Sequence, residues 1–356
     1  TIDEDSANKM SISVPTMTVG SLDIGHGAGT GGTADTNSTA VGKDALDGSV
    51  PGSTHNTAIG AGTLSATMTV DGDYNTAVGY NAGTAITSGE QNTAVGGSCL
   101  DETSTGDNNT AVGFAALGEI CVNDNTAVGK SALNAFTGSF ATAVGKGAAA
   151  AATDAANLTA IGKGALATCE DGASNTAVGT SALAGTTSGA NNTAVGVAAL
   201  DAVCVNDNTA IGLSALSAFT GSNATAVGSG AATLLTGASS PNGAATVAIG
   251  YQAMAVAVNQ AYCTAVGYQA LDAATSGNYN TAVGYSALGA TIDGAQNTAV
   301  GINALAADCV SNNTAVGVNS LAAFTGSDAV AVGHGVANAA TSATYLTAVG
   351  KDALGA

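Results

Sequence analysis

Lysine and tyrosine side chains that could bind a ligand recur at one position of a sequence repeat. The residue directly after a recurrent Ala-Val-Gly or Ala-Ile-Gly tripeptide is variable, and it holds five of the six lysines and four of the eight tyrosines. Two rows fall on consecutive repeats: Lys130, Lys146 and Lys163, and Tyr251, Tyr268 and Tyr285. Such rows could bind anionic glycans and sugar faces respectively, because each presents one contact at a fixed spacing. The alternative is a solubilising surface with aromatic rings stacked at a chain contact.

Acidic turns are the second candidate for chemistry. Four of their carboxylates could contribute oxygen ligands to Ca²⁺: Asp71, Asp73, Asp124 and Asp207. Asp is also a good turn former without any metal. His55 and His334 are 279 residues apart, and the chain contains no arginine to bind an anion. With no recognisable nucleophile, base or phosphate loop, we expect neither an enzyme nor a resident cofactor.

The six cysteines do not form a disulfide framework. Cys121, Cys204 and Cys309 begin near-copies of one line, and they lie 83 and 105 residues apart. In a stacked repeat these separations correspond to about 24 to 29 Å, beyond the ~7 Å between Cα atoms that a disulfide allows. We therefore predict six reduced thiols, mostly buried. Assembly in a reducing compartment favours a virion protein over a secreted one.

The repeat itself predicts short strands. The tripeptide occurs nineteen times, mostly every 16 or 17 residues, and Thr precedes it in all copies but two, which have Val247 and Val330. Thr and Val or Ile then alternate with Ala, which is the period of a strand, and β-branching favours that conformation. We expect the Thr and Val side chains to point into the core together with a Leu four residues after the Gly. The Ala face would then pack against another chain.

A column of asparagines precedes the predicted strands. Asn stands four residues before the Gly in eleven copies. Five of them follow one another on successive repeats: Asn56, Asn75, Asn92, Asn109 and Asn125. Stacked amide side chains can hydrogen-bond along such an array, so we interpret this column as a structural ladder at a turn.

These columns predict an all-β fold. Without tryptophan and with 50 glycines, the chain lacks the large side chains that a wide globular core requires. We expect a parallel β-solenoid of about 19–20 coils of 16–17 residues, since each coil needs to contact only its neighbours. Residues 1–22 would be a lead-in segment and residues 23–356 a single solenoid domain. The chain ends within a repeat, which suggests a fragment or a processed product.

Charge and hydropathy restrict the partners. Six basic against 25 acidic residues give a net charge of −19, which would repel nucleic acid. Neither an opening signal segment nor a run of 18 apolar residues occurs in this sequence, so we expect no membrane insertion.

The line "NTAVGYSALGATIDGAQNTAVG", at residues 280–301, resembles the shaft repeats of bacteriophage tail fibres, which often precede a C-terminal intramolecular chaperone. It is also similar to the head repeats of trimeric autotransporter adhesins, which form trimers of left-handed parallel β-rolls. The resemblance extends over about residues 23–354. It implies a left-handed, homotrimeric tail-fibre shaft in a virion, involved in host attachment, with a host cell-surface glycan or protein as a possible partner.

Two other functions stay open. The chain could be the head of a bacterial surface adhesin or an extracellular filament subunit, located at the cell surface or outside the cell. The threonine column also suggests an ice-binding solenoid, although threonines that point inward, as expected above, would disfavour it.

Overall fold

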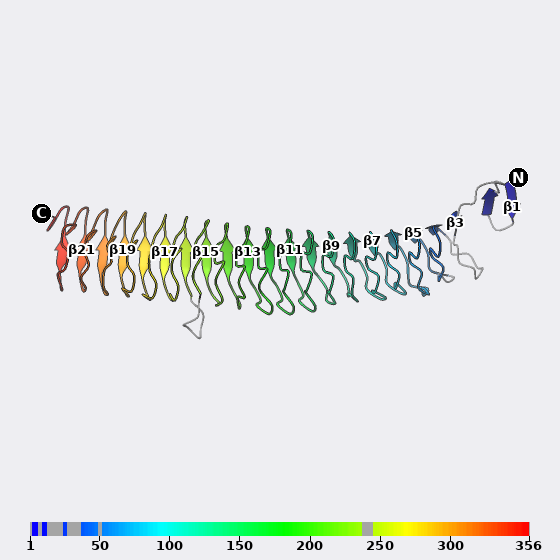
Figure 1. The fold of residues 1–356 in the computed structure, drawn as a ribbon, viewed down its shortest axis with the longest axis horizontal. Helices are drawn as coiled ribbons and strands as arrows, with labels where there is room; N and C mark the ends of the chain where they lie inside the picture. The colour runs from blue at the N-terminus through cyan, green and yellow to red at the C-terminus, as the bar shows by residue number, and fades with distance from the viewer. Residues whose placement is uncertain are drawn as a thin grey trace. The chain divides into compact units, whose positions relative to one another are not determined.

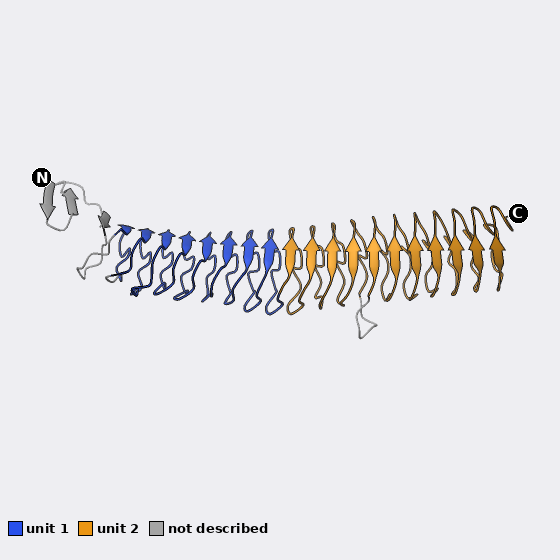
Figure 2. Cartoon of the chain, turned by 180° about the vertical axis from the view of Figure 1, so that it is seen from behind, with its two compact units in different colours: residues 1–173 blue, residues 174–356 orange. Residues whose placement is uncertain are grey.

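The computed structural model describes residues 2–5, 9–12, 24–26, 37–48, 52–236 and 245–355. The chain divides into two compact units, Thr1–Ala173 and Ser174–Ala356, which are coloured separately in Figure 2. In the described part of each unit the regular secondary structure is β-strand, with a three-residue strand in each repeat (Figure 1).

In the first unit, the repeats form one parallel ladder. Its strands are β4 (Thr39–Val41), β5 (Thr57–Ile59), β6 (Thr76–Val78), β7 (Thr93–Val95), β8 (Thr110–Val112), β9 (Thr126–Val128), β10 (Thr142–Val144) and β11 (Thr159–Ile161). Neighbouring strands pair in parallel with Thr beside Thr, Ala beside Ala and Val beside Val or Ile. The predicted parallel β-solenoid is therefore confirmed for these repeats.

The start of the first unit differs from the repeats. β1 (Ile2–Asp5) and β2 (Lys9–Ile12) form an antiparallel pair, within the segment expected to lead into the solenoid. β3 (Ile24–His26) pairs with β4 in the antiparallel direction. β3 is thus not part of a parallel coil, and within the described residues the parallel ladder starts at β4.

The second unit has the same ladder. Its strands are β12 (Thr176–Val178), β13 (Thr193–Val195), β14 (Thr209–Ile211), β15 (Thr225–Val227), β16 (Val247–Ile249), β17 (Thr264–Val266), β18 (Thr281–Val283), β19 (Thr298–Val300), β20 (Thr314–Val316), β21 (Val330–Val332) and β22 (Thr347–Val349). Each pairs in parallel with the next in the same register.

The prediction that the Thr and Val side chains of the strands point into the core was wrong. In β4–β22 the central Ala is buried, whereas the Thr (or Val) before it and the Val or Ile after it are half-buried or exposed. The reason is the width of the coil. A Cβ placed on Gly83, in the column that usually holds Leu, would lie 3.7 Å from Ala77 Cβ. The leucine column therefore packs directly against the strand, and only a methyl group fits between them.

The glycine that ends each strand is required by the stacking of the coils. Gly79 has φ 135°, and a Cβ there would lie 2.5 Å from the carbonyl oxygen of Gly96 in the next coil. Its N–H donates to the carbonyl of Ile59 in the previous coil at 2.8 Å. A side chain at this position would therefore collide with backbone that cannot move away.

Candidate functional site

One side of each ladder forms a regular exposed surface in both units. On every strand two β-branched side chains flank the buried Ala, and none of these positions holds a charged residue in β4–β22. Ile59 is 41% exposed and Val300 is 36% exposed. We call this surface the Thr/Val face.

Two columns of mostly exposed residues border the Thr/Val face. The leading edge consists of the residues two positions before each strand, and the trailing edge consists of the residues two positions after it. Trailing-edge side chains include both rows singled out from the sequence, and all six of those residues are exposed. The sequence interpretation of this column as a surface therefore agrees with the structure.

The tyrosine row is stacked. The ring centroids of Tyr251 and Tyr268 are 5.3 Å apart, and those of Tyr268 and Tyr285 are 5.1 Å apart with an interplanar angle of 6°. In the lysine row, Lys130 Nζ lies 5.7 Å from the centre of the Phe114 ring on the preceding coil. The two rows thus use the same column for different contacts.

Sequence reasoning missed the leading edge. The four tyrosines outside the trailing edge all lie there: Tyr74, Tyr262, Tyr279 and Tyr345. Tyr262 and Tyr279 stack at 5.2 Å, and Tyr74 stacks on His55 at 4.8 Å. The signal that could have found this column is that every tyrosine of the chain lies either five residues before or one residue after a repeat glycine.

The asparagine column is buried inside the coils. Asn56 Oδ1 accepts a hydrogen bond from the Asn75 backbone N–H at 2.8 Å, and Asn75 Oδ1 accepts one from Asn92 N–H at 3.0 Å. The pattern continues through Asn109 and Asn125. Each amide nitrogen also donates to a backbone carbonyl of the next coil, as Asn75 does to Gly89 at 2.8 Å. The bonds of this ladder therefore run mostly from side chain to backbone.

The cysteines lie in the interior. All six are buried, and within the described residues none forms a disulfide, as predicted. Burial raises the pKa of the Cys99 thiol to about 12 and that of Cys263 to about 11. Cys121 and Cys309 contact threonine hydroxyls of the preceding coil, at 3.1 Å (Thr103) and 3.4 Å (Thr291). These thiols are packing groups, since a buried thiol with a raised pKa is a poor nucleophile.

The carboxylates proposed for Ca²⁺ do not gather. Asp73 Oδ1 accepts a hydrogen bond from the Thr54 N–H, and Asp207 Oδ1 accepts one from Asn191 at 3.1 Å. Asp71 and Asp124 are exposed. Among the described residues no three His, Cys, Asp or Glu side chains are grouped as metal ligands would be.

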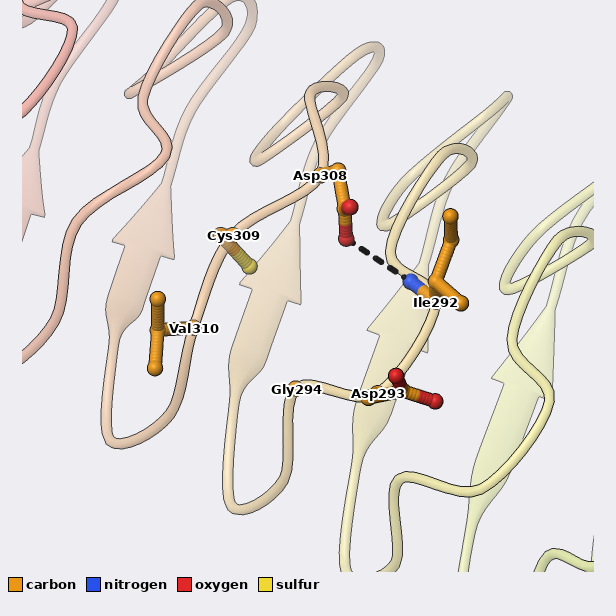
Figure 3. Close-up of a pocket in the computed structure, with 6 residues that line it drawn as sticks. All are labelled: Ile292, Asp293, Gly294, Asp308, Cys309 and Val310. Atoms are coloured by element: carbon orange, nitrogen blue, oxygen red, sulfur yellow. Dashed lines mark hydrogen bonds between the residues drawn. The ribbon is translucent and has the colours of Figure 1, made fainter.

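A depression between two coils of the second unit contains further carboxylates (Figure 3). Asp308 Oδ1 accepts a hydrogen bond from the Ile292 N–H at 2.9 Å, and Asp293 Oδ1 accepts one from Ser276 at 2.6 Å. Cys309 and Val310 complete its wall with Gly294. These carboxylates are already engaged in joining successive coils, so the depression is part of the turn structure.

No family model and no curated protein sequence matches this chain. In the described part of the chain, no helix has the length and apolar character needed to cross a membrane.

Proposed function

We propose that this chain is the shaft of a homotrimeric bacteriophage tail fibre, a structural protein and not an enzyme, with left-handed coils and a role in host attachment. The observation that carries the proposal is the continuous, uncharged Thr/Val face in each unit. The sequence analysis expected the Ala face to pack against another chain; in this proposal the Thr/Val face makes that contact.

Exposure of this face to water is unfavourable, and a partner that covers it would remove this cost. Burying a Val or Ile fully is worth about 1.5–3 kcal/mol, so the two fifths left open at Ile59 correspond to about 0.6–1.2 kcal/mol per strand. Single exposed apolar residues are normal, but here they recur on every strand of a unit and form one contiguous face. Contiguous apolar faces of this kind mark contact sites. Three chains that turn their Thr/Val faces toward a common axis would cover it.

Light scattering after size exclusion tests the trimer. The expected mass is three times the 33.4 kDa of the chain. A stable single-chain mass at micromolar concentration would contradict the proposal. Since an adhesin head would also be trimeric, the virion assignment needs its own test in the complete gene. A downstream chaperone domain would favour the fibre, whereas an outer-membrane anchor would favour the adhesin.

Ice binding is a second candidate, because the threonines point outward and not inward. Their hydroxyl and the neighbouring methyl groups repeat at about 4.8 Å along the ladder, and such an array could order water. A thermal hysteresis assay on the monomer tests this function. If the chain is a trimer without hysteresis, the face is an interface; a monomer that inhibits ice growth would favour the second candidate.

A further inference from the structure

The residues of the two edges are chemically segregated. In β4–β22 the trailing edge holds five lysines and no acidic residue: Lys43, Lys130, Lys146, Lys163 and Lys351. The leading edge holds three aspartates and no lysine: Asp124, Asp207 and Asp328. Of these eight residues all are exposed except Asp328, which is half-buried.

Within a single chain, the ion pairs of the described residues do not connect the lysines of the trailing edge with the aspartates of the leading edge. Within the described residues they are Lys43 with Asp44, His334 with Asp352, and Lys351 with Asp352, all on exposed side chains. None joins a leading edge to a trailing edge. The aromatic stacks likewise run along one edge and do not cross the Thr/Val face.

Complementary pairs appear when the two edges of one coil are compared. Asp124 and Lys130 flank β9, and Asp328 and His334 flank β21. Aromatic residues face each other or a lysine in the same way: Tyr74 and Tyr80, Phe140 and Lys146, Tyr262 and Tyr268, Tyr279 and Tyr285, Tyr345 and Lys351. On no strand do the two edges carry like charges.

Symmetry decides which edges meet. When parallel chains surround an axis along the solenoid, the trailing edge of one chain lies beside the leading edge of its neighbour, on the same coil. Antiparallel chains would instead bring trailing edge against trailing edge, placing the lysine column against itself without a carboxylate.

We propose that the chains assemble in parallel and in register, with the trailing edge of each chain contacting the leading edge of its neighbour at the same coil. The partner is a second copy of this chain, and the inference rests on the trimer proposed above. The Thr/Val face supplies the buried area, and the edges supply the register and direction through ion pairs, cation–π contacts and aromatic contacts.

Cross-linking of the full chain tests the pairing. The double variant Asp124→Cys/Lys130→Cys, treated with a short bismaleimide, is expected to give a covalent three-chain band on a denaturing gel. Each single variant is expected to give none, because each would place its thiol against a residue of the other edge. The wild type is treated in parallel to measure any contribution of the six buried cysteines.

A matched control tests the register. Asp124→Cys/Lys43→Cys places the second thiol at the trailing edge after β4, five coils from β9 and therefore about 24 Å away along the ladder. It is expected to give no three-chain band. Efficient linking by this control, or by a single variant, would overturn the pairing.

Light scattering on the same samples separates the two proposals. A three-chain mass with no link from the β9 double variant or from Tyr279→Cys/Tyr285→Cys would overturn the edge pairing alone. A single-chain mass for the wild type would overturn the trimer and the pairing together. The β18 pair guards against a local folding defect at β9.

Discussion

The lysine row beside β9–β11 and the tyrosine row beside β16–β18 stand at the same position of the repeat, each at the trailing edge of its own unit. Both regions bury the strand alanine completely, and both keep the same parallel register. Their exposed side chains nevertheless differ in chemistry. One row is cationic, and the other is a stack of aromatic rings whose centroids are 5.1–5.3 Å apart. The interior therefore fixes the coil, while the edge is free to vary with what it contacts.

The opposite edge also differs between the two regions. Across from the lysine row stand Asp124, Phe140 and Asn157, whereas across from the tyrosine row stand Ala245, Tyr262 and Tyr279. A partner that contacts both edges is the physical reason we offer for the pairs Asp124 with Lys130, Tyr262 with Tyr268 and Tyr279 with Tyr285.

The largest effect is expected from filling the common interior. Ala127→Val in the lysine region and Ala265→Val in the tyrosine region should each lower the free energy of unfolding by up to about 3 kcal/mol, because both sites are fully buried. Urea denaturation measures this loss. Thr126→Val and Thr264→Val are the matched controls and should be nearly neutral, since Val occupies that column at β16 and β21. Equal losses at the Thr and Ala positions would contradict the orientation of the strands.

The asparagine ladder should respond next. Asn109→Ala removes the acceptor of Asn125 N–H, at 3.0 Å, and the donor to the Val122 carbonyl, at 2.7 Å. We expect a loss of about 1–2 kcal/mol from buried backbone groups without partners, measured by urea denaturation. Asn134→Ala, which removes a half-buried amide with a bond to Ala115, is the control and should cost less.

In the tyrosine region the asparagine ladder is interrupted by a cysteine. There Cys263 replaces Asn, and its sulfur accepts the Asn280 N–H at 3.4 Å. Cys263→Asn should supply an oxygen acceptor and raise the unfolding free energy by about 0.5–1.5 kcal/mol. A lower midpoint for this variant would mean that the amide does not fit at this coil.

The rows themselves should contribute little within one chain. Tyr268→Ala removes two ring contacts and should cost about 0.5 kcal/mol, because the stack is half exposed. Lys146→Ala should be close to neutral in the isolated chain. Thermal denaturation of both variants, at a concentration where the mass is known, checks this difference. A much larger loss for either would assign it to an interface between chains.

The smallest effect concerns a half-buried carboxylate of the tyrosine region. Burial raises the pKa of Asp272, and a hydrogen bond from the Ala255 backbone offsets part of this rise. The protonated form is therefore favoured in the folded chain, so this stabilisation is present in acid and is lost as the pH rises through the folded pKa. Asp272→Asn, which copies Asn134 of the lysine region, should raise the thermal midpoint at pH 7 and not at pH 3. A gain of equal size at both values would contradict the shifted pKa.

The repeat pattern alone was sufficient for much of the fold. Its spacing predicted one strand and one coil per repeat, and the spacing of the cysteines predicted buried thiols without disulfides. The trailing-edge rows could be identified because their column tolerates lysine, tyrosine and valine alike, which buried positions do not.

The side of the strand that faces inward could not be read from the sequence. Alternation separates Thr and Val from Ala, and the larger apolar surface of Val and Ile favours placing their face inside, so hydrophobicity alone predicts the wrong face. Only the folded coil decides, because the leucine column of the opposite wall lies so close to the strand that a β-branched side chain is excluded and alanine alone fits. The spacing of the tyrosines marks the leading edge in the sequence, but only the folded chain places the side chains of that column beside the Thr/Val face.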